Sequence, residues 1–334
     1  KAIENIDIGG VSLIRSSVKN YRNVLVVVDP QDYTKFIANY KLNDTVLFRK
    51  EMAKKAIHYV TVYDQCISNY LDSKQNYINY YEKDSLKYGC NPLQESASIV
   101  KTTEPFPFQV LNGKPGYINY LDAISSWRLV NEATQCLGGT IVTSFKHTAP
   151  AGVARCVDSY TDTQDIIDKK LDIVYDITNQ IDLIKESTVA VAYIKARNSD
   201  PLSSFGDFIA VSHPVDLITA KLIKSYVSDG IIAPEYTKEA LEILSLKKKG
   251  NFIILKGELP YKVPDKAEYR ELFGGGLVQE PLTDISAFEE CVYTNPQNIP
   301  TKYKSIPDSS ITDLILANIT IKYTPSNSVA FAYN

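Results

Sequence analysis

A buried β-strand is predicted by the stretch Thr140-Ile141-Val142-Thr143-Ser144-Phe145, which ends on Lys146-His147. The stretch is rich in β-branched residues and is shorter than an ordinary helix. Pro150-Ala151-Gly152 come next, and we expect a new helix after them. A strand that leads through a loop into a helix is the repeating unit of α/β proteins.

The alternation of strands and helices continues on both sides of this stretch. Toward the N-terminus we expect a strand at 108–111, a turn at Asn112-Gly113, and a helix that carries Leu121, Ile124, Trp127 and Val130. Toward the C-terminus we expect strands at 208–211, 231–232 and 252–255 and helices at 217–227 and 239–246. This order predicts an α/β fold.

The first 71 residues alternate in the same way, over shorter segments. The predicted elements are strands at 6–8 and 24–28, a helix between them at 11–20, and a helix at 33–40 capped by Asp32. Apolar residues at three- and four-residue steps predict one long amphipathic helix over 51–71. The polar, tyrosine-rich stretch 72–87 is the best candidate for a domain boundary, because 334 residues suffice for about two domains.

Charge and hydropathy exclude several classes of partner. Lys and Arg number 36 against 39 Asp and Glu, and the longest basic run is Lys247-Lys248-Lys249. This balance argues against a nucleic-acid or anionic-membrane partner. The longest aliphatic run, at 24–28, is far shorter than the roughly 18 residues that a membrane-spanning helix needs.

The cysteines suggest a cytosolic protein, and the chain ends suggest that the sequence is only part of it. Five scattered cysteines without a CxxC pair fit a reducing compartment. The only methionine is Met52, so Lys1 is not expected to be the translated start. A strand is predicted at 328–333, directly before the last residue, so we expect both ends to be incomplete.

One of the three histidines stands in a chemically suggestive place. His58, His147 and His213 are not spaced like a zinc site, so we expect no metal site. His147 follows Lys146 at a strand end, where a lysine could stabilise developing negative charge and a histidine could act as a base. Both side chains reach one site only if the chain has left the strand there. A plain strand-to-loop corner fits the spacing equally well.

Glycines and one aspartate mark further candidate positions. Gly9-Gly10 before a helix could cradle a phosphate, but without the P-loop or GxGxxG spacing a tight turn is the simpler interpretation. The segment 203–207, Ser-Ser-Phe-Gly-Asp, could hold a ligand or form a turn. Asp229-Gly230 is expected at a helix end, where the helix dipole disfavours an acid, and this hints at a ligand.

Taken together, six segments resemble in order and spacing the bifunctional AICAR transformylase/IMP cyclohydrolase family of purine synthesis. They are 6–10 with Lys19, 87–89 with Asn91-Pro92 and Gln94, 144–147 with 150–152, 203–208, 227–234, and 322–324 with 326–328. The motif Ser-Phe-Lys-His at 144–147 resembles the eukaryotic branch of the family.

The resemblance implies two activities in two domains. Residues 1–80 would be the C-terminal part of a methylglyoxal-synthase-like cyclohydrolase domain, which closes FAICAR to IMP. Residues 81–334 would be the N-terminal and middle part of a cytidine-deaminase-like transformylase domain. That domain would pass a formyl group from its cosubstrate, 10-formyltetrahydrofolate, to AICAR. The family is a homodimer with shared transformylase sites.

The resemblance also implies roles for particular residues. Lys146, His147 and Asn327 would be catalytic, with His147 as the base and Asn327 as a donor to the formyl oxygen. The remaining implied residues are Lys87, Tyr88, Gly206 and Asp229 for AICAR, Leu202 and Phe205 for folate, and Asp7, Gly9, Gly10 and Lys19 for the cyclohydrolase nucleotide. A structural potassium ion would lie near 324–328.

Departures from the family pattern leave an alternative open. Lys87 stands where the family has Arg, which loses a bidentate grip on phosphate, and Leu93 replaces a usual His. The chain begins after the family's N-terminal phosphate loops and ends before its glycine-rich segment. The alternative is therefore a truncated, non-catalytic fragment that binds purine nucleotide or pairs with a full-length homologue.

Overall fold

The computed structural model describes residues 2–41, 45–71, 83–86, 88–100, 106–168, 181–261, 268–272, 275–280, 297 and 299–333. The described residues form two compact units, the first within residues 2–71 and the second within residues 83–333. The predicted boundary stretch 72–87 lies almost wholly outside the described residues, so the domain limits at 80 and 81 stay a prediction.

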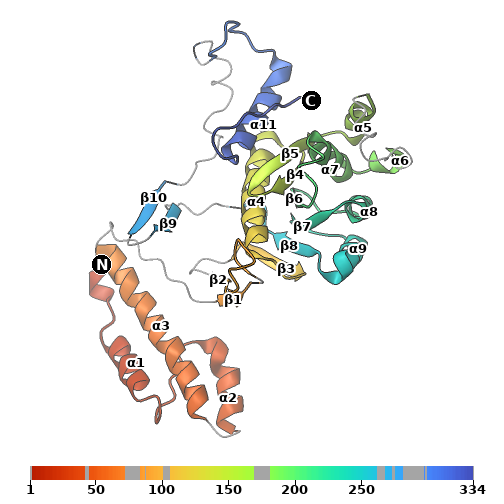
Figure 1. Cartoon of the computed structure of the whole chain (residues 1–334). Helices are drawn as coiled ribbons and strands as arrows, with labels where there is room; N and C mark the ends of the chain where they lie inside the picture. The colour runs from red at the N-terminus through yellow and green to blue at the C-terminus, as the bar shows by residue number, and fades with distance from the viewer. Residues whose placement is uncertain are drawn as a thin grey trace. The chain divides into compact units, whose positions relative to one another are not determined.

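The first unit is helical in its described part (Figure 1). It contains α1 (Gly9–Lys19), α2 (Tyr33–Lys41) and α3 (Val46–Leu71), with short 3₁₀ turns at Ile3–Asn5 and Pro30–Asp32. Helix α3 packs on α1 and buries Met52, Ala56 and Val60 along one stripe. The three predicted helices are confirmed, and α3 begins five residues before its predicted start.

Two predictions for this unit are wrong. Residues 6–8 and 24–28 form no strand, because neither pairs with the other or with another described segment of this unit. At the 3₁₀ turn Pro30–Asp32, which precedes α2, Asp29 accepts a backbone N–H from Gln31 over 2.9 Å. Asp32 accepts from Lys55 Nζ over 2.6 Å.

The second unit is built on a mixed sheet of six strands in the order β3-β8-β7-β6-β4-β5. The strands are β3 (Phe108–Asn112), β4 (Thr140–Lys146), β5 (Ala149–Cys156), β6 (Asp207–Val211), β7 (Ser228–Ala233) and β8 (Ile253–Gly257). Strands β6, β7 and β8 run parallel, and the other neighbouring pairs run antiparallel. Separate two-stranded pairs join β1 (Lys83–Ser85) to β2 (Ser98–Val100) and β9 (Glu268–Leu272) to β10 (Gly275–Gln279).

Helices cover both faces of the six-stranded sheet. They are α4 (Tyr117–Leu137), α5 (Ser159–Asp168), α6 (Ile181–Ile184), α7 (Thr188–Ser199), α8 (Leu217–Ser225), α9 (Lys238–Leu246) and α11 (Ile311–Lys322). Alternate residues of β6 divide between two cores, because Phe208 and Ala210 pack with α4 residues while Ile209 and Val211 pack with residues of α7 and α8. The predicted α/β class is confirmed. No helix of the described residues has the length and apolarity to cross a membrane.

Three sequence expectations in this unit are wrong. No helix begins directly after Gly152; residues 149–156 instead form β5, at the edge of the sheet, where a proline such as Pro150 removes no required hydrogen bond. Asp229-Gly230 does not end a helix, because α8 stops at Ser225 and both residues lie in β7. Residues 328–333 form no strand.

Candidate active site

One edge of the six-stranded sheet gathers the candidate residues of the second unit. Phe145, Phe208 and Gly230 are neighbours across β4, β6 and β7. Strand β4 runs antiparallel to the other two, so the residue after Phe145 and the residues before Phe208 and Gly230 lie at the same edge. These are Lys146, Asp207 and Asp229, and the loop 202–206 leads into the same edge. Three segments that are far apart in sequence therefore converge.

A tight turn carries the lysine–histidine pair. Lys146 pairs with Ala149, and only His147 and Thr148 lie between β4 and β5. Both turn residues have positive φ, 54° and 63°, as a two-residue hairpin turn requires. The chain therefore leaves the strand at His147, which is the condition under which both side chains can reach one site.

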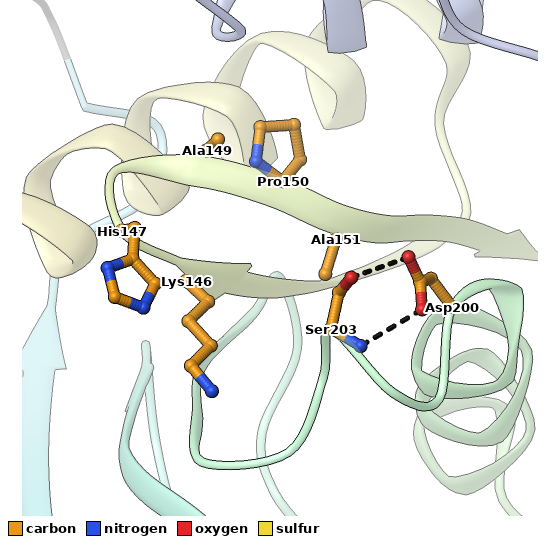
Figure 2. A pocket seen from close by; sticks show the side chains of 7 residues that line it. All are labelled: Lys146, His147, Ala149, Pro150, Ala151, Asp200 and Ser203. Atoms are coloured by element: carbon orange, nitrogen blue, oxygen red, sulfur yellow. Dashed lines mark hydrogen bonds between the residues drawn. The ribbon is translucent and has the colours of Figure 1, made fainter.

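The two side chains line one pocket with residues of the 200–206 loop (Figure 2). The pocket has a volume of about 410 Å³ and is lined by Lys146, His147, Ala149, Pro150, Ala151, Asp200 and Ser203. Asp200 accepts from both the backbone N–H and the hydroxyl of Ser203, and these hydrogen bonds lower the pKa of Asp200. The pocket therefore offers a cation and an imidazole on one wall and an ionised carboxylate on another.

Gly206 sits where a side chain would strain the site. Its φ is +81°, and a Cβ built there would lie 3.7 Å from Lys146 Nζ. Its N–H donates to the carbonyl of Val227 over 2.9 Å, and Lys146 Nζ donates to the carbonyl of the preceding Phe205. The loop that ends on Gly206 is thus tied to both β4 and the start of β7. Leu202 and Phe205 expose 88% and 60% of their surface on this loop.

A buried ion pair lies directly beneath this loop. Arg197 of α7 donates to Asp207 over 2.8 Å, and the two side chains are 1% and 0% exposed. Ser144 donates to the same carboxylate over 2.7 Å, and its oxygen lies 2.9 Å from that of Ser204. Arg197 also donates to the carbonyl of Val227 over 3.0 Å. One ion pair therefore connects all three converging segments.

Asp122 of α4 is a site residue that sequence reasoning missed. It is 5% exposed, and its Oδ1 accepts the backbone N–H of Thr148 over 2.7 Å. Burial and, to a smaller extent, the charge of Asp229 raise the pKa of Asp122 to about 6, although the Thr148 hydrogen bond and the charge of His147 lower it. The available signal was an acid one turn before Ser126 on the buried face of an amphipathic helix.

Asp229 is held by a partner on a neighbouring loop. Lys248 Nζ donates to its carboxylate, and the two side chains are about half exposed. Lys248 has a positive φ of 52° and lies in the 3₁₀ turn Lys247–Gly250 that follows α9. An anionic or hydroxylated ligand at this edge would meet Asp229 and Lys248 together.

Other predicted transformylase residues are not in this pocket. Lys87 lies outside the described residues. Tyr88 belongs to the segment between β1 and β2, where the Gly89 N–H donates to the Gln94 carbonyl over 2.9 Å. Leu93 is 89% exposed. Asn327 is exposed in the segment after α11, which packs on α4 and β5.

A buried carboxylate anchors the segment that leads to Asn327. Glu132 of α4 is 1% exposed and accepts from Lys322 Nζ and from the Tyr323 hydroxyl, each over 2.8 Å. Both donors stand at the end of α11, four and five residues before Asn327. The same helix, α4, therefore supports this segment through Glu132 and the His147 turn through Asp122.

The candidates of the first unit surround helix α1. Asp7 Oδ1 accepts the N–H of Gly10 over 3.0 Å at the helix start, and the Asp7 N–H donates to the Tyr63 hydroxyl over 2.6 Å. Gly9 opens α1, and Lys19 is its exposed last residue. Ten helical steps of about 1.5 Å separate Gly9 from Lys19, so Asp7 and Lys19 lie at opposite ends of α1.

The other two histidines and the described cysteines lie outside this pocket. His213 lies after the other end of β6, where its Nδ1 is 2.8 Å from the Ser212 oxygen, and burial lowers its pKa. His58 is half-buried in α3. In the part of the chain that the structure describes, no group of three His, Cys, Asp or Glu could hold a metal ion, and all four cysteines are free.

Comparison with known proteins finds one family over nearly the whole length of the chain. The family model described as AICARFT/IMPCHase bienzyme matches residues 17–334. The bifunctional purine biosynthesis protein PurH of Leuconostoc mesenteroides is 31% identical over 346 residues, which cover 100% of this chain and 59% of that protein. The PurH proteins of Persephonella marina and Petrotoga mobilis are 32% and 33% identical, and each alignment covers 99% of this chain and 59% of the relative.

These matches confirm the resemblance seen in the sequence. The chain spans about 59% of the length of the curated relatives it matches. The family match includes the Lys146–His147 turn, the 200–206 loop and the start of β7, which form one edge of the sheet. The chain belongs to the AICARFT/IMPCHase bienzyme family.

Proposed function

We propose that this chain carries a formyl-transfer site and part of a cyclohydrolase of de novo purine synthesis. In the first reaction, a formyl group passes from 10-formyltetrahydrofolate to the 5-amino group of AICAR. In the second reaction, the product FAICAR closes to IMP with loss of water. The observation that carries the proposal is that Lys146 and His147 line one pocket at a sheet edge shared with Gly206 and Asp229.

The chemistry of the first step explains why these residue types are needed. The amine of AICAR is a weak nucleophile beside a carboxamide, so orientation and charge stabilisation must lower the barrier. The amine nitrogen attacks the formyl carbon, and His147 accepts the proton that the nitrogen loses. The carbonyl oxygen becomes an oxyanion, to which Asn327 donates a hydrogen bond. The oxyanion then collapses and the bond to folate N10 breaks. N10 takes up the proton that His147 had accepted, which gives tetrahydrofolate, while the Lys146 ammonium stabilises the charge around the formyl and leaving groups.

Ligand contacts follow from the same edge of the sheet. Lys87, Tyr88, Gly206 and Asp229 are proposed to hold AICAR. Leu202 and Phe205 present exposed apolar surface beside the pocket, and such surface suits the flat pterin and benzoyl rings of folate. These contacts would bring the formyl group between the two substrates, at the lysine–histidine turn.

The first unit is proposed to belong to the cyclohydrolase. Asp7, Gly9, Gly10 and Lys19 would contact the nucleotide, with the two glycines at the start of α1, where backbone N–H groups attract an anion. We propose the family's architectures for the two units, methylglyoxal-synthase-like for the first and cytidine-deaminase-like for the second.

A homodimer with shared transformylase sites, in the cytosol, completes the proposal. A structural potassium ion is proposed near 324–328. The Thr324 hydroxyl donates to the Thr320 carbonyl over 2.8 Å, and its oxygen remains an acceptor of the hard kind that such cations prefer.

The direct test is release of tetrahydrofolate from 10-formyltetrahydrofolate by the purified protein, with and without AICAR. AICAR-dependent release is the expected result, and conversion of FAICAR to IMP is measured in a separate assay. Release of tetrahydrofolate that does not depend on AICAR would reject formyl transfer. Nucleotide binding without turnover would favour the non-catalytic fragment instead.

A further inference from the structure

We propose that Asp122 is a positioning residue, whose buried carboxylate fixes the Thr148 backbone and thereby aims His147 into the pocket. The inference rests on the proposed formyl transfer, in which His147 accepts a proton. Asp122 does not line the pocket, so its action on the reaction would pass through the turn rather than through a substrate.

The backbone of the turn needs such support. His147 and Thr148 both adopt positive φ, although neither is Gly, Asn or Asp, the residues that favour two-residue hairpin turns. For a β-branched residue such as threonine, positive φ is a strained conformation that the surroundings must enforce. The hydrogen bond from the Thr148 N–H to Asp122, at 2.7 Å, is a charge-assisted bond to the strained residue itself.

The carboxylate is buried within reach of two residues of the proposed site. Asp122 is 5% exposed, and the charges of both His147 and Asp229 act on it. Helix α4 is anchored in the core by Ala123 and Trp127, which are 0% and 1% exposed. Asp122 therefore connects the buried face of α4 to the turn that carries His147.

Three variants separate positioning from ordinary stabilisation. Asp122→Ala removes the acceptor, whereas Asp122→Asn keeps a carbonyl oxygen that can accept from Thr148. Asp216→Ala is the matched control, because Asp216 accepts the Thr219 N–H over the same 2.7 Å at the start of α8. Asp216 follows the C-terminal end of β6, whereas the turn lies beside the N-terminal end of that strand.

Hydrogen exchange of the Thr148 amide, followed by NMR, is the readout that needs no activity. Slow exchange is expected in the parent protein and in Asp122→Asn, and fast exchange in Asp122→Ala. The kcat of formyl transfer is expected to fall about 10- to 100-fold in Asp122→Ala, as for a misaligned catalytic group. The KM for AICAR should change by less than about threefold, Asn should restore most of kcat, and Asp216→Ala should leave kcat unchanged.

Two results would overturn the inference: unchanged kcat in Asp122→Ala, or Thr148 exchange that is equally slow in both Asp122 variants. Cooperative unfolding of each variant shows whether it is folded. If the parent protein transfers no formyl group, the proposed function fails, and the exchange measurement still decides whether Asp122 holds the turn.

Discussion

Arg197 and Asp207 form an ion pair of 2.8 Å between two side chains that are almost completely buried. Burial raises the pKa of Asp207, and Arg197 and Ser144 oppose that rise. The pair joins three segments: Asp207 follows the 200–206 loop, Ser144 of β4 donates to Asp207, and Arg197 donates to the Val227 carbonyl before β7. A charged pair in this position stabilises the fold only while both partners are present.

Arg197→Met should therefore destabilise the protein strongly. The substitution leaves the Asp207 carboxylate buried without its cation, and the expected loss in the free energy of unfolding is about 3–5 kcal/mol. The control is Glu235→Gln, which breaks the more exposed pair with Lys256 and should cost no more than about 1 kcal/mol. Urea unfolding measures both. Equal, small losses in the two variants would show that the buried pair is dispensable.

Asp122 should give the protein a distinctive pH dependence of stability. Its pKa is about 6 in the folded protein, against an ordinary value of 3.8, so the folded state keeps a proton that the unfolded chain releases. The free energy of unfolding should therefore fall as the pH rises through this window. Asp122→Asn removes the titration, so the variant should gain about 2 kcal/mol relative to the parent protein between pH 4 and pH 7.

Asp200→Asn is the control for that measurement. The pKa of Asp200 is lowered by its hydrogen bonds to Ser203, so its stabilising contribution is complete above its ordinary value of 3.8 and is lost only at lower pH. The stability difference between this variant and the parent should stay nearly constant from pH 4 to pH 7. A similarly flat difference for Asp122→Asn would mean that Asp122 titrates normally.

Gly206→Ala should impair turnover through backbone strain. A residue with a Cβ at φ +81° is strained by about 1–2 kcal/mol, while the added atom, 3.7 Å from Lys146 Nζ, would not clash. We expect a loss of stability of that order and a lower kcat, because the loop would shift against Lys146. Gly138→Ala, at φ +60° with open space around it, should lose at least as much stability and keep its kcat. Normal turnover in Gly206→Ala would separate the loop from the reaction.

The layered core could be predicted from sequence because its pattern is local. Strand β4 and helices α3, α4 and α9 follow from β-branched runs and from apolar residues at helical spacing. The strand prediction at 24–28 shows the limit of this reasoning. Five aliphatic residues suit a strand, but a strand needs a neighbour, and the described part of the first unit is helical.

The hairpin that forms the site could not be predicted from its own residues. His147-Thr148 lacks the Asn-Gly or Asp-Gly signal of a tight turn. Pro150 and Gly152 indicated a loop before a new helix rather than a strand. Their roles are tertiary: Pro150 lies in an edge strand, and a Cβ on Gly152 would lie 1.9 Å from the Ala196 carbonyl of α7. Asp122 and Arg197 were missed because a charged residue in a helix is usually exposed.

The central claim is that Lys146 and His147 carry out formyl transfer rather than hold the fold. The most direct measurement compares kcat and AICAR affinity in Lys146→Ala and His147→Ala with the control Lys238→Ala, an exposed lysine at the start of α9. Turnover should be abolished in the first two variants and kept in the control. AICAR binding should stay within about tenfold in all three, which corresponds to roughly 1.4 kcal/mol. Near-normal turnover in either Lys146→Ala or His147→Ala would contradict the claim.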